Sequence, residues 1–194
     1  MEAWVRASWS DRGDETKVTS GKRIEALGHA LGMEVLIAAR KTPPTSSLNR
    51  LLPTTNPEEH RVSFDDVLRR STVIVLSLPR NAETLNLLST AEFAQMSQYA
   101  VLINIARGGI VDETAVVHAL KEGQIAGYAT DVFQEEPAEG AEATPLLSEE
   151  AKGLNITVTP HLAWFSQRTL TNLGRILGNT VEAWAGGKEI NVIA

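Results

Sequence analysis

A permanent cation, two carboxylates and a histidine follow predicted strands of this sequence. Arg107 stands between an apolar run and a pair of glycines, and its planar fork suits a carboxylate or another anion. Asp131 ends a second run, Glu136 lies five residues beyond it, and His161 follows a third run. A carboxylate that orients a histidine makes an acid–base unit. Together these residues could hold an anionic substrate and move a proton.

Each residue also has an ordinary structural interpretation. Arg107 could form a surface ion pair, and Asp131 could cap a helix or a turn. His161 could be a hydrogen-bonded histidine near the core, and Glu136 could belong to a solvated acidic loop. Their joint placement at one sheet edge favours a site, because ligands of open α/β sheets bind at the carboxyl ends of the strands.

The composition narrows the choice of partners. The 194 residues carry a net charge of −6, which argues against nucleic acid or an anionic membrane as the main partner. The chain has no cysteine, which excludes disulfides, thiolate metal sites and cysteine nucleophiles, and we predict no metal. The first residues lack the apolar core of a secretory signal, and no apolar run is long enough for a membrane span. We therefore predict a cytoplasmic protein.

The elements that must position these residues alternate between strands and helices. Short β-rich runs predict strands at 34–38, 72–78, 100–106, 126–131 and 155–160. Several of these runs are almost continuously apolar, as expected for strands covered on both faces. The sequence therefore predicts an α/β fold, with a doubly wound parallel sheet and helices on both sides.

The helices between these strands have recognisable ends. Ser63 precedes one short helix, Ser89 with Glu92 forms a capping box, and Asp112 can cap a third helix. The segment 21–32 places Ile24, Leu27 and Leu31 on one face. A long amphipathic helix is predicted within 166–187, and its apolar face consists of Leu170, Leu173, Leu177, Val181 and Trp184. Residues 41–61 read as a long surface loop, rich in Pro, Ser, Thr and Asn.

The stretches NIARGGIVDETAVVHALKEGQIAGYATDVFQEEP, at 104–137, and VTPHLAW, at 158–164, carry a resemblance. They resemble the D-isomer-specific 2-hydroxyacid dehydrogenase family, in particular its glycerate dehydrogenase and hydroxypyruvate reductase branch. The resemblance covers roughly residues 20–194. It implies a Rossmann-like cofactor domain, a second domain that closes over it, and a homodimer.

The resemblance also implies a role for each site residue. Arg107 would bind the carboxylate and carbonyl of the substrate, Glu136 would support the histidine, and His161 would be the general acid and base. Asp131 would face the nicotinamide carboxamide. His161 would donate a proton to the carbonyl oxygen of a 2-keto acid while the nicotinamide delivers hydride to the carbon. Cofactor contacts are expected from Gly21, Lys22, Arg23, Arg40, Lys41, Ser77, Leu78, Pro79, Ile105, Ala106, Arg107, Asp131 and His161.

The sequence departs from the family before residue 20. The family has a strand and a G-x-G-x-x-G turn there, whereas only Gly21 matches the last glycine of that pattern. We therefore predict that the first strand of the sheet is absent and that its neighbours lose a partner. The predicted domains are an atypical segment at 1–19, an incomplete dinucleotide-binding domain at 20–165, and a C-terminal helix and tail at 166–194.

The choice between NAD and NADP depends on the end of the strand at 34–38. NAD users of the family carry an acid there, whereas this chain has Ala39, Arg40 and Lys41. Two cations favour the 2′-phosphate of NADP over NAD. The alternative is that both cations are solvated loop residues. Separately, a phosphate of either cofactor could meet the helix start at Gly21, beside Lys22.

The main hypothesis is thus an oxidoreductase that transfers hydride between NAD(P) and a 2-keto or 2-hydroxy acid, such as hydroxypyruvate or glyoxylate. Two alternatives stay open. One is a catalytically inactive, truncated paralogue that acts as a binding or regulatory partner. The other is a nucleotide-sensing protein similar to the corepressors that share this fold.

Overall fold

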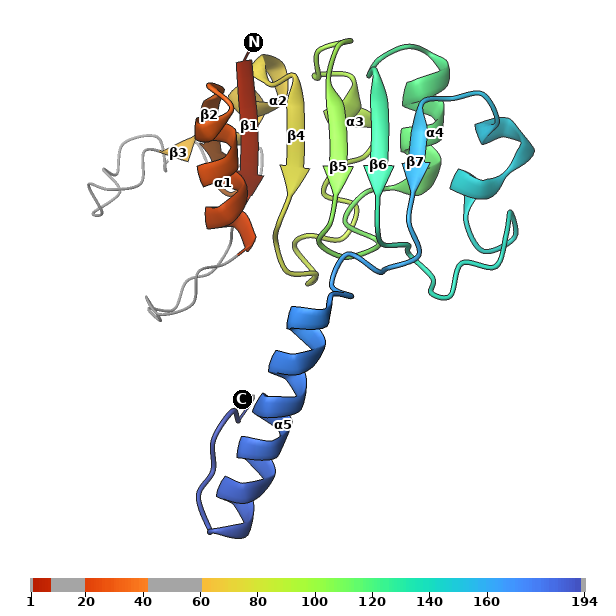
Figure 1. Ribbon diagram of the computed structural model, residues 1–194. Coiled ribbons are helices and arrows are strands. Elements are labelled where there is room, and N and C mark those ends of the chain that lie inside the picture. The colour runs from red at the N-terminus through yellow and green to blue at the C-terminus, as the bar shows by residue number, and fades with distance from the viewer. Residues whose placement is uncertain (1, 8–19, 42–60, 193–194) are drawn as a thin grey trace. The chain divides into compact units, whose positions relative to one another are not determined.

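The computed structural model describes residues 2–7, 20–41 and 61–192. It divides into two compact units, Met1–Pro160 and His161–Ala194, and each is described by itself. The first unit contains the sheet, and the second contains one long helix with a short tail (Figure 1). Compactness alone does not define a functional domain, so the predicted limits at 19/20 and 165/166 stay a proposal.

A seven-stranded sheet forms the centre of the first unit, and all of its neighbouring strands run parallel. The strand order is β3-β2-β1-β4-β5-β6-β7. The strands are β1 Glu2–Ala7, β2 Glu34–Ala38, β3 Arg61–Val62, β4 Val73–Leu76, β5 Val101–Asn104, β6 Gly127–Thr130 and β7 Ile156–Val158. The five predicted strands are confirmed: β2 has the predicted bounds, and the other four are two or three residues shorter than their predicted runs.

The prediction that the sheet lacks its first strand is wrong. β1 lies in the middle of the sheet, where its backbone pairs Arg6 with Ile37 of β2 on one side and with Val75 of β4 on the other. Sequence reasoning missed it because Glu2 and Arg6 interrupt the short run, so it lacks the continuous apolar character of a buried parallel strand. The two missing glycines of the family turn are a separate matter, since residues 8–19 lie outside the described part.

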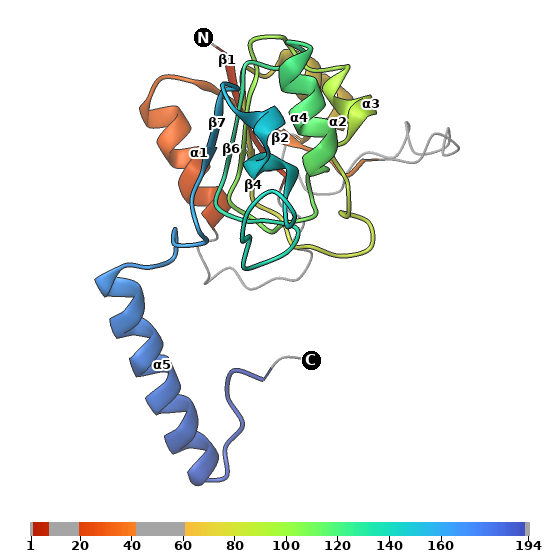
Figure 2. The same cartoon turned by 90° about the vertical axis from the view of Figure 1, so that its right-hand side faces the viewer.

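Helices cover both faces of the sheet, as predicted. α1 Ser20–Ala30 lies on one face, and α2 Phe64–Arg70, α3 Thr90–Phe93 and α4 Glu113–Lys121 lie on the other (Figure 2). The predicted caps are confirmed: Ser63 accepts from Asp66 N, Asp112 accepts from Ala115 N, and Ser89 forms its capping box with Glu92. Two short 3-10 helices, η2 Pro145–Leu147 and η3 Glu149–Ala151, lie within the acidic segment before β7.

The core lies mainly between the sheet and helices α2 to α4. Leu102 and Ile74 project from neighbouring strands into a cluster with Phe93 of α3 and Val116 of α4, and all four are buried. Val101 and Ile103 point to the opposite face, because side chains alternate along a strand, and they are only half-buried. The α2–α4 side of the sheet is therefore the more completely covered one.

α1 packs differently from its predicted amphipathic pattern. Its buried residues are Gly21 and Gly28, whereas Leu27 and Leu31 are largely exposed. The helix contacts β1 and β2, so the strand that was predicted to be missing is part of its support. Glycines on the packed side let the helix approach the sheet closely, and the leucines then point away from it.

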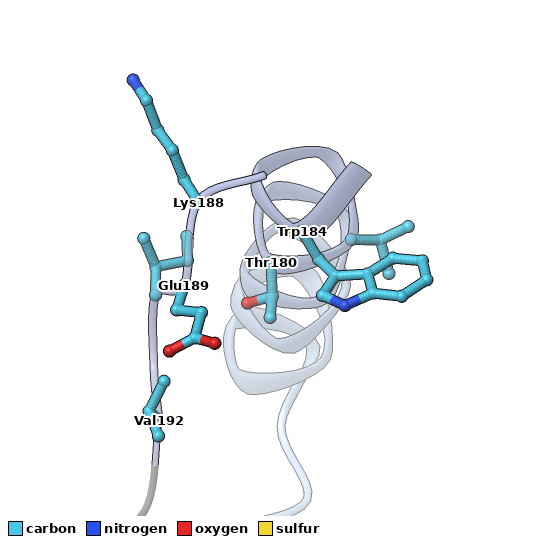
Figure 3. A pocket seen from close by; sticks show the side chains of 7 residues that line it. Thr180, Trp184, Lys188, Glu189 and Val192 are labelled. Atoms are coloured by element: carbon cyan, nitrogen blue, oxygen red, sulfur yellow. The ribbon is translucent and has the colours of Figure 1, made fainter. Parts of the chain in front are cut away.

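The second unit is built around α5, Gln167–Ala185. The predicted helix is confirmed, and Ser166 caps it by accepting from Thr169 N. The chain after α5 turns back along its last turns. A hollow of about 370 Å³ lies there (Figure 3), and it is lined by Thr180, Val181, Trp184, Lys188, Glu189, Ile190 and Val192.

No helix in the described part of the chain is long and apolar enough to span a membrane.

Candidate active site

The carboxyl ends of the parallel strands meet at one edge of the sheet, which is the lower edge in Figure 1. The loops that leave β4, β5 and β6 at this edge carry most of the predicted site residues. The corner that follows β5, residues 104–109, lies between the other two because β5 is the middle strand of the three.

Asn104 builds the corner after β5. Its side chain is buried, its Oδ1 accepts from Ala106 N at 3.1 Å, and its Nδ2 donates to the Arg107 carbonyl at 3.1 Å. The amide thus spans the turn and fixes the backbone of Ala106 and Arg107. A buried polar side chain must be hydrogen-bonded to be tolerated, and here both ends of the amide are satisfied by the turn itself.

Arg107 lies on the exposed side of this corner. Its Nη1 donates to the Ala106 carbonyl at 2.7 Å, which holds the guanidinium close to its own backbone. The described residues offer it no carboxylate partner. The structural alternative of a surface ion pair therefore has no counterpart in the described part of the chain, and an anionic ligand remains the partner that the chemistry favours.

Glycine is required at position 108. A Cβ added there would lie 1.6 Å from the Phe133 carbonyl oxygen and 2.6 Å from Gln134 N. Both are backbone atoms, so no side-chain movement could relieve the contact. The absence of a side chain lets the loop after β6 pass directly over the corner after β5, which brings Glu136 to the same edge as Arg107.

Glu136 is held by the backbone of its own loop. Its Oε1 accepts from Phe133 N at 2.9 Å. The preceding part of this loop is braced by buried Glu113 at the start of α4, which accepts from Gln134 N at 2.7 Å and from Thr144 Oγ1 at 2.6 Å. The carboxylate of Glu136 is therefore oriented rather than mobile, which is what a residue that positions a histidine needs.

Asp131 is buried at the end of β6. Thr159, which directly follows β7, donates from its hydroxyl to Asp131 Oδ1. Thr130 donates to the Val132 carbonyl at 2.7 Å and thereby shapes the turn below it. The bond between Asp131 and Thr159 ties the exit of β6 to that of β7.

Tyr128 lies within β6 below this edge, and burial raises its pKa to about 12 although hydrogen bonds with Thr130 and Asn104 act in the opposite direction. Its hydroxyl is therefore protonated at neutral pH. Tyr128 therefore brings a neutral polar group, and no charge, next to Thr130 and Asn104.

The segment after β4 reaches the same edge. Leu78 is buried, Ser77 is half-buried and Pro79 is exposed. Thr84 closes the following turn, because its hydroxyl accepts from Asn81 N at 2.7 Å and donates to the Pro79 carbonyl at 2.9 Å. A rigid backbone of this kind is suited to contact a ligand through peptide groups.

Lys41 already has a partner. Its Nζ lies 2.8 Å from Oε1 of Glu92, a buried carboxylate of α3, and 5.9 Å from the centre of the Phe64 ring. Glu92 also accepts from Ser89 N through its other oxygen. A phosphate would have to compete with this pair for Lys41. Arg40 precedes it and is exposed.

The residues at the start of α1 fit a phosphate group. The helix begins at the carboxyl end of β1 (Figure 1), and its first N–H groups and dipole favour an anion. Gly21 is buried while Lys22 and Arg23 are exposed. Buried Ala106 and exposed Ile105 lie on the corner after β5, which β4 separates from β1 in the sheet. Part of a dinucleotide site is thus present, without the first two glycines of the family turn.

His161 begins the second unit, directly after Thr159 and Pro160. It is half-buried and has a positive φ of 55°, a conformation that non-glycine residues rarely adopt and that is most frequent at special sites. The structure places Arg107, Asp131 and Glu136 at one edge of the first unit. That His161 belongs to the same site stays a prediction.

The hollow of Figure 3 and the predicted site have no residue in common. The described residues contain no group of three or more His, Cys, Asp or Glu that could hold a metal ion. The hollow lies wholly in the second unit, and none of the predicted site residues lines it. It is apolar and formed by α5 and the tail, so the chemistry of the strand edge is the stronger guide to the site.

Sequence reasoning missed several supporting residues. Asn104 is the one with a readable signal, because it interrupts the buried run LINIA with a polar side chain. Glu113 and Thr159 carry no such signal, since a glutamate in a first helical turn and a threonine beside a proline are common. Their roles follow from contacts between segments far apart in the chain.

Comparison with known proteins identifies the fold and the family. Residues 19–163 match the model of the D-isomer specific 2-hydroxyacid dehydrogenase NAD binding domain. The chain is 35% identical over 173 residues to a glycerate dehydrogenase of Methylorubrum extorquens, covering 89% of this chain and 49% of that protein. It is 34% identical over 168 residues to a glyoxylate reductase of Aeropyrum pernix, covering 87% and 46%.

Solved structures agree at the level of the fold. A D-isomer specific 2-hydroxyacid dehydrogenase from Lactobacillus delbrueckii ssp. bulgaricus, in its NAD complexed form, has a TM-score of 0.73 at 23% identity, over 98% of this chain and 55% of that one. The chain spans about half the length of the curated relatives that it matches. The chain belongs to the D-isomer specific 2-hydroxyacid dehydrogenase family, and residues 19–163 are its NAD-binding domain.

Proposed function

We propose that this chain is an oxidoreductase of the D-2-hydroxyacid dehydrogenase type, which transfers hydride between a nicotinamide dinucleotide and a 2-keto or 2-hydroxy acid such as hydroxypyruvate or glyoxylate. The observation that carries the proposal is the edge on which Arg107, Asp131 and Glu136 lie, fixed by Asn104, Gly108 and Thr159. The glycerate dehydrogenase and glyoxylate reductase names of its relatives point to the same class of substrate.

Each residue of the site has a proposed task. Arg107 binds the carboxylate and carbonyl oxygens of the substrate and stabilises negative charge that develops on the carbonyl oxygen. His161 donates a proton to that oxygen during reduction and accepts it back during oxidation. Glu136 orients the histidine ring and favours its protonated form.

Chain connectivity supports the inclusion of His161. Thr159 is tied to Asp131 by its hydroxyl, and two residues of extended chain span at most about 7 Å. The backbone of His161, two residues beyond Thr159, therefore stays within about 7 Å of the residue that bonds Asp131. The proposal requires only this short reach.

A nicotinamide dinucleotide, when bound, supplies or accepts the hydride. We propose that the start of α1, with Gly21, Lys22 and Arg23, holds its phosphates. The segment Ser77 to Pro79 and the backbone of Ile105 and Ala106 line its path, and Asp131 faces its carboxamide.

NADP selection is proposed to depend on Arg40 and Lys41, and a phosphate must compete with buried Glu92 for Lys41. Breaking the pair of Lys41 and Glu92 leaves a buried carboxylate without its cation, which is costly. Arg40→Met should then reduce the preference for NADPH over NADH, and Lys41→Met should also lower the free energy of unfolding. If Lys41→Met alone removes the NADPH preference, the assignment to Arg40 is wrong.

The nucleotide proposal is tested by titrating the chain with NADH and with NADPH while following tryptophan fluorescence. Saturable quenching by either nucleotide is expected. The comparison variant is Gly21→Glu, which places a negative side chain at the proposed phosphate site and should weaken binding about tenfold or more. A chain that shows no saturable change with either nucleotide does not bind the cofactor.

The catalytic proposal is tested by following nucleotide oxidation with hydroxypyruvate and with glyoxylate. His161→Ala should lower the rate by about 10²- to 10⁴-fold, as expected for loss of a general acid. His118→Ala is the matched control, because His118 lies exposed on α4 and its loss should leave the rate unchanged. Equal rates in the wild type and in His161→Ala would remove His161 from the mechanism.

The family match favours a dehydrogenase over an inactive paralogue or a corepressor-like protein. A homodimer, which the family resemblance implies, and a cytoplasmic location also stay proposals. Sedimentation of the purified chain tests the first of these, with about twice the monomer mass of 21.0 kDa expected.

A further inference from the structure

We propose that Arg80 is a second anion-binding residue of this site, beside Arg107, and that the site takes a ligand with a second anionic group. The inference rests on the proposed function, in which Arg107 holds the first carboxylate. The second anionic group is carried either by the far end of a 2-keto acid or by a phosphate of the dinucleotide. Both present oxygen atoms that a guanidinium binds with its fork.

The guanidinium of Arg80 lies flat against Gly109. A Cβ built on Gly109 would be 3.4 Å from Cζ, 3.4 Å from Nε and 3.4 Å from Nη2 of Arg80. A point can be equally far from these three bonded atoms, at that distance, only if it lies over the face of the group. The N–H bonds lie in the plane of the guanidinium and are therefore not directed at Gly109.

The backbone on both sides of this contact is fixed. Gly109 has a φ of +74°, a conformation that suits glycine, and its carbonyl accepts from Asn86 N at 2.8 Å. On the other side Thr84 is fully buried, and its hydroxyl ties the turn after Pro79 together. Arg80 thus projects from a rigid turn onto the same corner that carries Arg107. The backbone that carries Arg80 is thus ordered before a ligand binds.

The carboxylates near this corner do not pair with its two arginines. Among the described residues neither Arg80 nor Arg107 forms an ion pair, although the whole chain carries a net charge of −6. Glu83, three residues from Arg80, does not pair with it. The nearby carboxylates have other donors: Asp131 accepts from Thr159, Glu113 from Thr144, and Glu136 from Phe133 N. Two guanidinium groups on one corner, without acidic partners, form a site for a doubly anionic ligand.

The test compares three ligands and three forms of the chain by isothermal titration calorimetry. The ligands are 2-oxoglutarate, with two carboxylates, pyruvate, with one, and inorganic pyrophosphate. The forms are the wild type, Arg80→Gln and Arg70→Gln. Arg70 is the matched control, because it bonds Glu34 at 3.1 Å at the opposite edge of the sheet, where β2 begins.

Arg80→Gln should weaken the binding of 2-oxoglutarate or of pyrophosphate by about tenfold or more, the effect of losing a hydrogen bond to a charged group. Pyruvate binding and the Arg70→Gln form should stay at wild-type affinity. A loss confined to 2-oxoglutarate assigns the second anion to the substrate, and a loss confined to pyrophosphate assigns it to the dinucleotide.

Three results would overturn the proposal: unchanged affinity of Arg80→Gln for both ligands, an equal loss in Arg70→Gln, or no binding of either ligand to the wild type. The proposed function fails separately. The binding of doubly anionic ligands could depend on Arg80 while nucleotide neither quenches the tryptophan fluorescence nor is oxidised by the chain. In that case the anion site stands and the dehydrogenase assignment fails.

Discussion

The two units of the chain treat their apolar side chains in opposite ways. In the first unit Leu102, Phe93 and Val116 are fully buried between the sheet and its helices. In the second unit α5 has no buried residue, and its five apolar face residues have exposed fractions between 42 and 75%. The helices of the first unit and α5 all have amphipathic sequences, so the sequence pattern alone does not tell which of them is buried.

The difference teaches that a hydrophobic stripe predicts a helix, whereas burial requires a partner for that stripe. The helices of the first unit find theirs in the sheet. Within its own unit α5 meets only the short tail after it, where Trp184 and Ile190 line an open hollow (Figure 3). Most helical stability in proteins comes from tertiary packing. We therefore expect the first unit to carry most of the free energy of unfolding.

The comparison is tested most strongly in the core. Leu102→Ala should lower the free energy of unfolding by about 2–5 kcal/mol, because a large buried side chain leaves a cavity. Urea denaturation followed by circular dichroism measures this change. A loss below about 0.5 kcal/mol would mean that the first unit is not held by this core.

The next effect depends on pH and on buried Tyr128. Its pKa is raised from 10.0 to about 12 in the folded chain, so the folded state holds the proton more tightly than the unfolded state. The resulting stability is fully present below pH 10 and is lost as the pH rises towards 12, by roughly 2–3 kcal/mol in total. Tyr128→Phe should remove this component from the difference between unfolding curves at pH 9 and pH 11.5. The same pH dependence in both proteins would show that Tyr128 does not contribute.

A smaller effect is expected at the start of α2. Ser63 accepts from Asp66 N at 3.2 Å, and its loss in Ser63→Ala should cost about 1 kcal/mol of the free energy of unfolding. Ser63→Thr keeps the hydroxyl, which accepts from Asp66 N and donates to Asp66 Oδ2, and should restore most of that loss. If both variants unfold at the same denaturant concentration, the cap is not what stabilises this helix.

The smallest effect sharpens the contrast with the core. Leu177→Ala removes a leucine that is 63% exposed on α5, and the free energy of unfolding should change by less than about 0.5 kcal/mol. It has the same chemistry as Leu102→Ala and differs only in burial. A loss comparable to that of Leu102→Ala would show that the α5 face is covered in solution.

Much of the first unit could be predicted from the sequence, because its signals are local. The capping residues Ser63, Ser89 and Asp112 act within three residues of themselves. The strands at 72–78 and 100–106 are apolar over most of their length, so periodicity was sufficient to find them. The position of Asp131 could be predicted because the carboxyl ends of parallel strands lie at the same edge of a sheet.

The remaining features depend on contacts between distant segments. β1 is held by pairing with strands on both sides, and the apolar pattern of its six residues is too weak to predict a strand. Lys41 was assigned to a phosphate because its partner, Glu92, lies 51 residues away in sequence. The exposure of Leu27 on α1 depends on which side of the helix the glycines bring to the sheet.

The central position of β1 has a consequence for synthesis on the ribosome. This strand emerges before both of the strands that flank it, and β4, its partner on one side, follows only after β2 and β3. The nascent strand must therefore wait, with both hydrogen-bonding edges open, until those later segments are translated. Such delayed, non-local pairing is slow and exposes the chain to aggregation. Slower translation before β4, or a chaperone that shields the first residues, should thus influence the yield of folded chain more than any change in α5.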